Sequence, residues 1–218
     1  MPTVPVAGII FDLDGVLIDS VGAHLESWRV LGRQRGKTIT EACFLSTFGR
    51  PNADIVPILF PEEATPEGLR RIADEKEAAY RDLVRGRLPV VPGAVELVRG
   101  CRATGLKLAV GSSTPPENIA LALEEMGVAD CMVAVVSGDD VRRGKPDPEV
   151  FLTAAERLGL APEQCVVIED APAGVEAALR AGMRVAAVAT THPAEELAKA
   201  HCVTASVVDL SPETLRRM

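Results

Sequence analysis

The second half of the chain alternates short apolar runs with helical patterns, and this alternation constrains the fold more strongly than any other feature of the sequence. The helical patterns end at Gly127, Gly159 and Gly182. Short buried strands separated by helices are typical of a parallel sheet covered on both faces. We therefore predict an α/β fold with a doubly wound parallel sheet, whose strands are residues 7–11, 106–111, 131–136, 165–168 and 184–188.

The sequence pattern of residues 20–87 differs from that of the second half: it has helical periodicity and no apolar run typical of a buried strand. Helices are expected here over 21–35, 52–60 and 65–86, and in the rest of the chain over 94–103, 116–126, 147–158 and 173–181. The composition, 47% hydrophobic over 218 residues, is enough for one large core and a small second one. We expect an all-helical insert, residues 20–87, within a core domain of residues 1–19 and 88–218.

Two aspartates, Asp12 and Asp14, follow the first apolar run and precede Gly15. In an extended backbone their side chains lie on one side, while Leu13 points into the core. Two carboxylates this close stay ionised together only if a cation lies between them or one of them holds a proton. Taken alone, the motif is equally compatible with a catalytic pair and with an acidic turn after a strand.

Polar residues also follow the other predicted strands. Sites in doubly wound sheets form outside the carboxyl ends of the strands, so these side chains should meet Asp12 and Asp14 at one edge. They are Ser112, Ser113, Lys145, Glu169 and Asp170. Together the groups supply a nucleophile, donors for phosphoryl oxygens and carboxylates for a metal, which phosphoryl transfer requires. Oxygen ligands without imidazole or thiolate nearby favour Mg²⁺ over zinc.

Each of these groups also has a structural alternative. The hydroxyl residues at 112–114 precede a predicted helix and are compatible with a helix cap. Lys145 is compatible with an ordinary solvated lysine. Glu169 and Asp170 are compatible with an acidic pair that is stabilised by the dipole of the following helix.

Charge and cysteine content narrow the classes of function. A formal net charge of −8 argues against a general nucleic-acid or anionic-membrane surface. The five cysteines are odd in number and form no Cys-x-x-Cys pair, which indicates reduced thiols rather than a zinc site. With no leader-like segment and no apolar run of membrane-spanning length, we expect a soluble, cytoplasmic protein without nucleic-acid or membrane partners.

Four segments resemble, in order, the four motifs of the haloacid dehalogenase-like (HAD) hydrolase superfamily, most of whose members are phosphatases. They are Phe11 to Val16, Val110 to Ser112, Gly144 to Phe151, and Glu169 to Val175. The resemblance implies that Asp12 is a nucleophile that forms an aspartyl-phosphate and that Asp14 is the general acid/base. It also implies that Ser112 binds the phosphoryl group, that Lys145 balances charge, and that Mg²⁺ is held by Asp12, Asp14, Glu169 and Asp170.

The predicted helical insert resembles the C1 cap of this superfamily, a lid that excludes water and recognises the substrate. Ser20, His24, Arg50 and Lys76 lie where β-phosphoglucomutase-like members have cap or hinge residues. The resemblance implies a substrate-binding set of Ser113, Arg50, His24 and Lys76. As alternatives, His24 is a helix-surface residue beside Trp28, Lys76 an exposed helix charge and Arg50 a loop cation.

The expected function is a Mg²⁺-dependent phosphatase of small phosphorylated metabolites, foremost sugar phosphates, acting as a monomer or small homo-oligomer. A β-phosphoglucomutase is the alternative, although Pro115 and Pro116 stand where mutase relatives tend to have Lys and Asn. A catalytically silent binding module is a third possibility, which the intact motifs disfavour. Asp14 disfavours a dehalogenase. A Schiff base on Lys76, as in phosphonoacetaldehyde hydrolases, is disfavoured because its acidic neighbours should keep it protonated.

Overall fold

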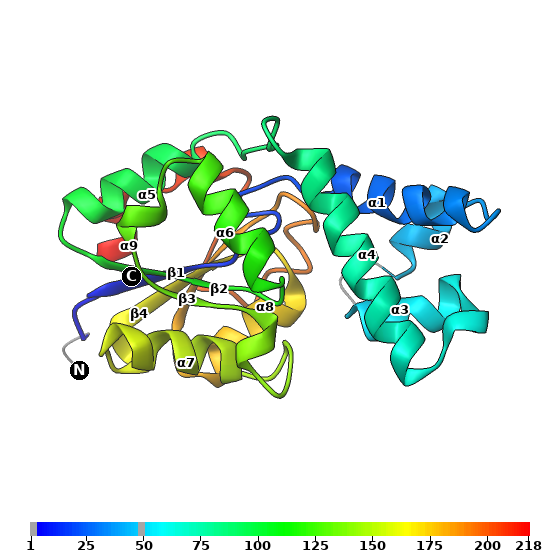
Figure 1. Ribbon diagram of the computed structural model, residues 1–218. Coiled ribbons are helices and arrows are strands. Elements are labelled where there is room, and N and C mark those ends of the chain that lie inside the picture. The colour runs from blue at the N-terminus through cyan, green and yellow to red at the C-terminus, as the bar shows by residue number, and fades with distance from the viewer. Residues whose placement is uncertain (1–3, 48–50) are drawn as a thin grey trace. The chain divides into compact units, whose positions relative to one another are not determined.

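The computed structural model describes residues 4–47 and 51–218, and Figure 1 shows its helices and strands. The chain forms two compact units. One unit consists of Met1–Asp19 and Pro89–Met218, and the other of Ser20–Leu88. Leu88 therefore groups with the second unit, one residue beyond the end of the insert expected from the sequence.

A parallel sheet of six strands, counted over the described residues, forms the centre of the first unit. The strands are β1 (Gly8–Phe11), β2 (Lys107–Gly111), β3 (Met132–Val136), β4 (Cys165–Glu169), β5 (Arg184–Val188) and β6 (Cys202–Thr204). Their order across the sheet is β3-β2-β1-β4-β5-β6. Phe11 at the end of β1 pairs with Val110 of β2 and with Ile168 of β4. This register brings the residues that follow these three strands to the same edge of the sheet.

Helices cover both faces of the sheet (Figure 1). They are α5 (Ala94–Ala103), α6 (Pro116–Glu125), α7 (Glu149–Leu158), α8 (Pro172–Arg180) and α9 (Pro212–Arg216). On one face, apolar residues of α7 and α8 form a core with alternate strand residues such as Ile10, Ala109 and Val167. Helices α5, α6 and α9 lie on the other face. The predicted doubly wound α/β class is confirmed, and coverage of both faces explains why the central strands are continuous apolar runs.

The described residues of the second unit form helices and connecting loops without a strand, and they have their own core. Its helices are α1 (Val21–Gln34), α2 (Glu41–Leu45), α3 (Asn52–Leu59) and α4 (Pro66–Val84). Trp28, Phe60 and Ile72 are among the buried apolar residues of this core. The hydroxyl of Thr65 accepts a hydrogen bond from the backbone N–H of Gly68, which caps α4 at the position where the sequence predicts its start.

Two short α-helices, α2 and α9, and one short strand, β6, were absent from the sequence prediction. Helices α2 and α9 contain five residues each, and β6 contains three. Elements this short do not complete enough of a helical or alternating period to be recognised. They form because the larger elements supply a surface on which they pack.

Candidate active site

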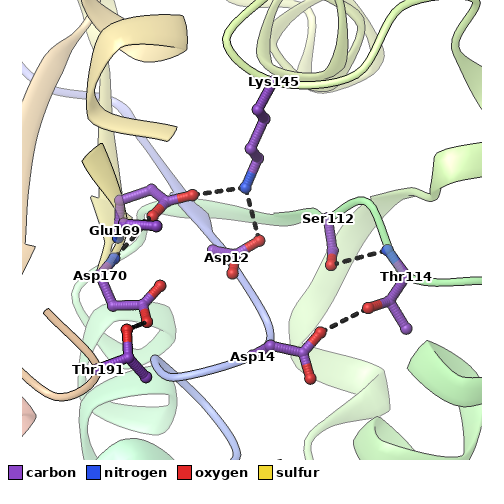
Figure 2. Close-up of polar contacts among 9 residues, drawn as sticks. Asp12, Asp14, Ser112, Thr114, Lys145, Glu169, Asp170 and Thr191 are labelled. Carbon is purple, nitrogen blue, oxygen red and sulfur yellow. Dashed lines mark hydrogen bonds and ion pairs between the residues drawn. The ribbon is translucent and has the colours of Figure 1, made fainter. Parts of the chain in front are cut away.

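The residues that follow β1, β2 and β4 converge at one edge of the sheet, where Lys145 joins them from the loop before α7 (Figure 2). Asp12, Ser112, Glu169 and Asp170 are all buried. The convergence that the sequence predicts for these strand ends is therefore present in the structure. The register of the parallel sheet causes it, since 157 positions separate Asp12 from Glu169 along the chain.

Lys145 lies between two carboxylates. Its Nζ donates hydrogen bonds to Asp12 Oδ1 at 2.7 Å and to Glu169 Oε1 at 2.6 Å. The ammonium group also lies 4.7 Å from the centre of the Phe151 ring, a cation–π distance. The side chain is 11% exposed, so Lys145 is not the ordinary solvated lysine that the sequence left open as an alternative.

Glu169 uses both of its carboxylate oxygens. While Oε1 accepts from Lys145, Oε2 accepts from the backbone N–H groups of Asp170 and Ala171, both at 2.7 Å. The start of α8 approaches this carboxylate closely, because a Cβ atom on Gly174 would lie 1.7 Å from Glu169 Oε1. Glu169 thus links Lys145 to the backbone at the beginning of α8.

Asp12 and Asp14 lie in the loop after β1, not in the strand itself, because β1 ends at Phe11. The simple alternation of an extended backbone therefore does not place them, although Leu13 is fully buried as expected. The loop turns at Gly15, which has a φ of +77°. A Cβ atom at Gly15 would lie 2.0 Å from Asp170 Oδ2, so a residue with a side chain does not fit here.

Thr114 connects Asp14 with Ser112, a link that the sequence interpretation missed. Its hydroxyl donates to Asp14 Oδ2 at 2.5 Å, and its backbone N–H donates to Ser112 Oγ at 3.2 Å (Figure 2). A hydroxyl residue two positions after a predicted site serine was the available signal. The neighbouring Ser113, predicted to bind substrate, is exposed.

Thr191 is a second residue that the sequence interpretation missed. It follows β5, and its hydroxyl donates a hydrogen bond to Asp170 Oδ2. The neighbouring Thr190 donates to the backbone carbonyl of Gly15 at 2.6 Å. The only signal in the sequence was that this pair of hydroxyl residues follows a predicted strand.

Burial and like charges perturb the ionisation of the cluster. Burial raises the pKa of Asp12 to about 7; Lys145 opposes this rise, and Glu169 and Asp14 add to it. Burial, reinforced by the charges of Glu169 and Asp12, raises the pKa of Asp170 to about 9. Burial alone would lower the pKa of Lys145, but Asp12 and Glu169 raise it, so the ammonium group stays charged. The raised pKa values of Asp12 and Asp170 mean that these two carboxylates resist being ionised together.

The donor set fits a divalent cation. Over the described residues, one group of potential metal ligands is found, in which carboxylate oxygens of Asp12, Glu169 and Asp170 lie within 4.8 Å of one another. The group contains neither imidazole nor thiolate, and hard oxygen donors suit Mg²⁺. Asp14, predicted as a further ligand, is not in this group.

Two candidate substrate residues of the helical unit, Lys76 and His24, contact each other and other side chains of the same unit. Lys76 is 3% exposed and therefore not an exposed helix charge. Its Nζ lies 2.7 Å from His24 Nδ1 and 2.9 Å from Glu77 Oε1. His24 stacks on the Tyr80 ring at 4.3 Å between centroids. Arg50 lies outside the described residues.

Comparison with protein families and with other proteins gives consistent findings. Residues 6–182 match the family described as haloacid dehalogenase-like hydrolase. A phosphorylated carbohydrates phosphatase of Thermotoga maritima is 36% identical over 80% of this chain and 81% of its own. The fructose-1-phosphate phosphatase YqaB of Escherichia coli is 31% identical over 81% of this chain and 93% of its own.

Among solved structures, the β-phosphoglucomutase of Clostridium difficile superposes with a TM-score of 0.84 at 28% identity. The match covers 97% of this chain and 96% of that one. Within its described residues, the chain contains no helix that is both long enough and apolar enough to cross a bilayer.

Proposed function

Because the chain belongs to the haloacid dehalogenase-like hydrolase family, we propose that it is a phosphatase that hydrolyses small phosphorylated metabolites, foremost sugar phosphates, in the presence of Mg²⁺. The observation that carries this proposal is the position of Asp12. Its carboxylate is buried, is held by Lys145 at 2.7 Å, and lies in an oxygen cluster with Glu169 and Asp170. This is a nucleophile beside a fixed cation and a candidate cation site.

In the first proposed step, a carboxylate oxygen of Asp12 attacks the phosphorus atom of the substrate. The bond from phosphorus to the leaving oxygen breaks, and Asp14 gives its proton to that oxygen, so that an alcohol leaves. In the second step, Asp14 takes a proton from water as the water oxygen attacks phosphorus. The bond from phosphorus to Asp12 breaks, which releases inorganic phosphate and regenerates both residues.

The charges around Asp12 support this role. An ionised Asp12 and a phosphate dianion repel each other, and Lys145 lies where it reduces that repulsion. Ser112 is buried beside the same edge, and its hydroxyl already accepts the N–H of Thr114, so its own proton remains available to a phosphoryl oxygen. Glu169 holds the ammonium group in place through its contact of 2.6 Å.

We assign the metal-binding role chiefly to Asp12 and Asp170. Both Glu169 oxygens already accept hydrogen bonds, which suits Glu169 to orienting Lys145. Asp14, whose carboxylate accepts from Thr114, is assigned to proton transfer. A bound Mg²⁺ would neutralise charge on the carboxylates and on the transferring phosphoryl group.

We further propose that the helical unit is a cap that recognises the part of the substrate beyond the phosphate. His24 and Lys76 contact each other within it, and Arg50 is retained as a candidate. The names of the similar phosphatases support phosphorylated carbohydrates as the substrate class.

A mutase is a second candidate, favoured by the structural similarity to a β-phosphoglucomutase. A mutase must hold both phosphates of a bisphosphate intermediate. Helix α6 begins at Pro116, and Pro115 precedes it, so neither residue offers a backbone N–H near Ser112 and neither carries a polar side chain. This loss of donors favours hydrolysis.

The test is a screen of phosphate release over a panel of phosphorylated metabolites, with Mg²⁺ and with excess chelator. We expect Mg²⁺-dependent release that is fastest for one or a few sugar phosphates. Undiminished release in chelator contradicts the metal requirement, and no release from any compound contradicts the phosphatase.

A second measurement separates hydrolysis from isomerisation. Phosphorus NMR follows β-glucose 1-phosphate with the enzyme, Mg²⁺ and a trace of the bisphosphate. We expect inorganic phosphate to form faster than glucose 6-phosphate, and the reverse order would establish the mutase instead.

A further inference from the structure

We propose that Thr114 is a positioning residue that holds Asp14 in the orientation required for proton transfer and links it to Ser112. This inference rests on the proposed function, in which Asp14 is the general acid/base. In this role, Thr114 acts through the hydrogen bond between its hydroxyl and the carboxylate of Asp14, and it need not touch the substrate.

Thr114 is itself fixed on three sides. Its hydroxyl donates to Asp14 Oδ2 at 2.5 Å, and its N–H donates to Ser112 Oγ at 3.2 Å. Its carbonyl accepts from the N–H of Gly138 at 3.1 Å, which ties it to the segment after β3. The residue is 9% exposed, so water competes little for its hydroxyl. These three hydrogen bonds hold the backbone and the hydroxyl group of Thr114 in a single orientation.

The hydroxyl of Thr114 does not serve to cap a helix. Helix α6 begins at Pro116, its N-cap residue is Pro115, and no side chain accepts a hydrogen bond at this cap. The helix-cap alternative left open by the sequence therefore does not account for Thr114. The hydrogen bond from its hydroxyl goes instead to Asp14, 100 positions earlier in the chain.

The chemical consequence concerns the two oxygens of Asp14. Since Oδ2 accepts the hydroxyl proton of Thr114, a proton that Asp14 carries resides on Oδ1. The hydrogen bond also limits rotation of the carboxylate about its last single bond. A proton carried on one oxygen in one orientation reaches the leaving oxygen without a search through conformations, which is a contribution of positioning to rate.

The same residue orients the serine that we propose to bind the phosphoryl group. Because the Ser112 oxygen accepts the N–H of Thr114, its own hydrogen points away from Thr114. Thr114 thus contacts both proposed donors: Asp14, which protonates the leaving oxygen, and Ser112, which donates to a phosphoryl oxygen.

The experiment compares two esters that differ in their need for a general acid. One is the sugar phosphate hydrolysed fastest in the panel, whose alkoxide leaving group requires a proton. The other is 4-nitrophenyl phosphate, whose leaving group departs without one. The value of kcat/KM is measured for both at saturating Mg²⁺, since it reports the steps up to release of the leaving group and excludes the later attack of water.

Thr114→Val keeps the shape of the side chain and removes the hydroxyl, whereas Thr114→Ser keeps the hydroxyl. We expect Thr114→Val to lower kcat/KM for the sugar phosphate by about tenfold or more, a part of the full general-acid contribution, and to change the value for the nitrophenyl ester by less than about threefold. Thr114→Ser should restore most of the loss. An equal loss on both esters, or no loss on either, overturns the inference.

Two control variants make the result interpretable. Thr190→Val removes a hydroxyl that donates to the carbonyl of Gly15, next to Asp14 but not to its carboxylate, so any loss should be equal on the two esters. Asp14→Asn should lose activity selectively on the sugar phosphate. If Asp14→Asn shows no such selectivity, the proposed acid role itself fails. If Asp14→Asn is selective and Thr114→Val is not, only the positioning inference fails.

Discussion

The hydroxyl of Thr191 donates a hydrogen bond to Asp170 Oδ2, and the same hydroxyl oxygen lies 2.9 Å from Nδ1 of His192. Asp170 is 5% exposed and faces the carboxylates of Asp12 and Glu169. A buried carboxylate oriented by a neighbouring hydroxyl is the arrangement expected for a metal ligand with a supporting outer contact.

The first prediction therefore concerns metal affinity. Thr191→Val should weaken Mg²⁺ binding by about 10- to 100-fold, because Asp170 loses the contact that orients it. Asp170→Asn should weaken it further, since a ligand charge is lost. Isothermal titration calorimetry with Mg²⁺ alone measures both effects. Thr104→Val, which removes a hydroxyl that donates to Cys101 at 2.8 Å, is the matched control and should bind Mg²⁺ as the wild type does. Unchanged affinity in Asp170→Asn contradicts the assignment of this residue as a ligand.

The second prediction concerns Asp12. Asp12→Asn should retain less than about one hundredth of wild-type turnover, a loss of at least ~2.7 kcal/mol, because an amide is a far poorer nucleophile. The fold should persist, since Lys145 keeps its contact of 2.6 Å with Glu169. Rapid-quench assays measure turnover, and circular dichroism checks the fold. A folded variant with turnover above that limit would rule out a covalent role for Asp12.

The third prediction concerns the stability of the metal-free protein as a function of pH. In the folded protein the pKa of Asp12 rises from 3.8 to about 7, and that of Asp170 rises from 3.8 to about 9. Both groups have a higher pKa in the folded protein than in the unfolded chain. Their contribution to the free energy of unfolding is therefore full below pH 3.8. It is lost as the pH rises through about 7 for Asp12 and about 9 for Asp170. A bound Mg²⁺ would relieve the repulsion among the ionised carboxylates.

The stabilisation by Mg²⁺ should therefore grow as the pH rises over this range, and binding should release protons. Urea unfolding in Mg²⁺ and in chelator, at several pH values, measures the first effect. Calorimetry in buffers of different ionisation enthalpy measures the second. The Asp12→Asn/Asp170→Asn double variant is the control, and it should lose the Mg²⁺-dependent increase in stability. A Mg²⁺ effect that is the same at every pH is the contrary outcome.

The fourth prediction concerns the buried pair in the helical unit. The side chains of Lys76 and Glu77 are 4% and 9% exposed and lie 2.9 Å apart. Burial raises the pKa of Glu77, but Lys76 and His24 outweigh burial, and the net pKa lies below its ordinary range. Lys76→Met should lower the free energy of unfolding of this unit by about 3 kcal/mol, because the buried carboxylate of Glu77 loses the ammonium group that lies 2.9 Å from it.

The double variant Lys76→Met/Glu77→Gln should recover much of that loss, since it removes both charges. Chemical denaturation of the four proteins in the cycle gives the coupling energy. Because the pKa of Glu77 is lowered in the folded protein, the pair should stabilise the fold at neutral pH. This stabilisation should be lost as the pH falls below 4.5, the ordinary pKa of glutamate. Simple addition of the two single effects would show that the pair is not coupled.

The fold was accessible from the sequence where elements are long or fully buried. The alternation of apolar runs and helices predicted five of the strands, and Ala94–Ala103 and Arg184–Val188 have the predicted bounds. The short elements α2, β6 and α9 were not predicted. Whether they form depends on packing against the rest of the structure, and a few residues do not encode that in a local pattern.

Part of the candidate site could likewise be predicted from the sequence. Asp12, Ser112, Lys145 and Glu169 were named from strand ends and motifs, because the carboxyl ends of parallel strands meet at one edge of the sheet. Their catalytic roles stay predictions, as does the substrate role of His24, Lys76 and Ser113. Oligomeric state and cellular location also remain as predicted from the sequence.

The sequence by itself determined which chemical groups this protein has and which of them follow each strand. Strands buried on both faces are continuous apolar runs, and these runs are visible along the chain. Only the tertiary structure decided which partners those groups meet. The contacts of Thr114 with Asp14 and of Thr191 with Asp170 join residues 100 and 21 positions apart. Hydrogen bonds depend on distances of a few tenths of an ångström and on the direction of a side chain, and these quantities exist only after the sheet has set its register and the loops have packed around it.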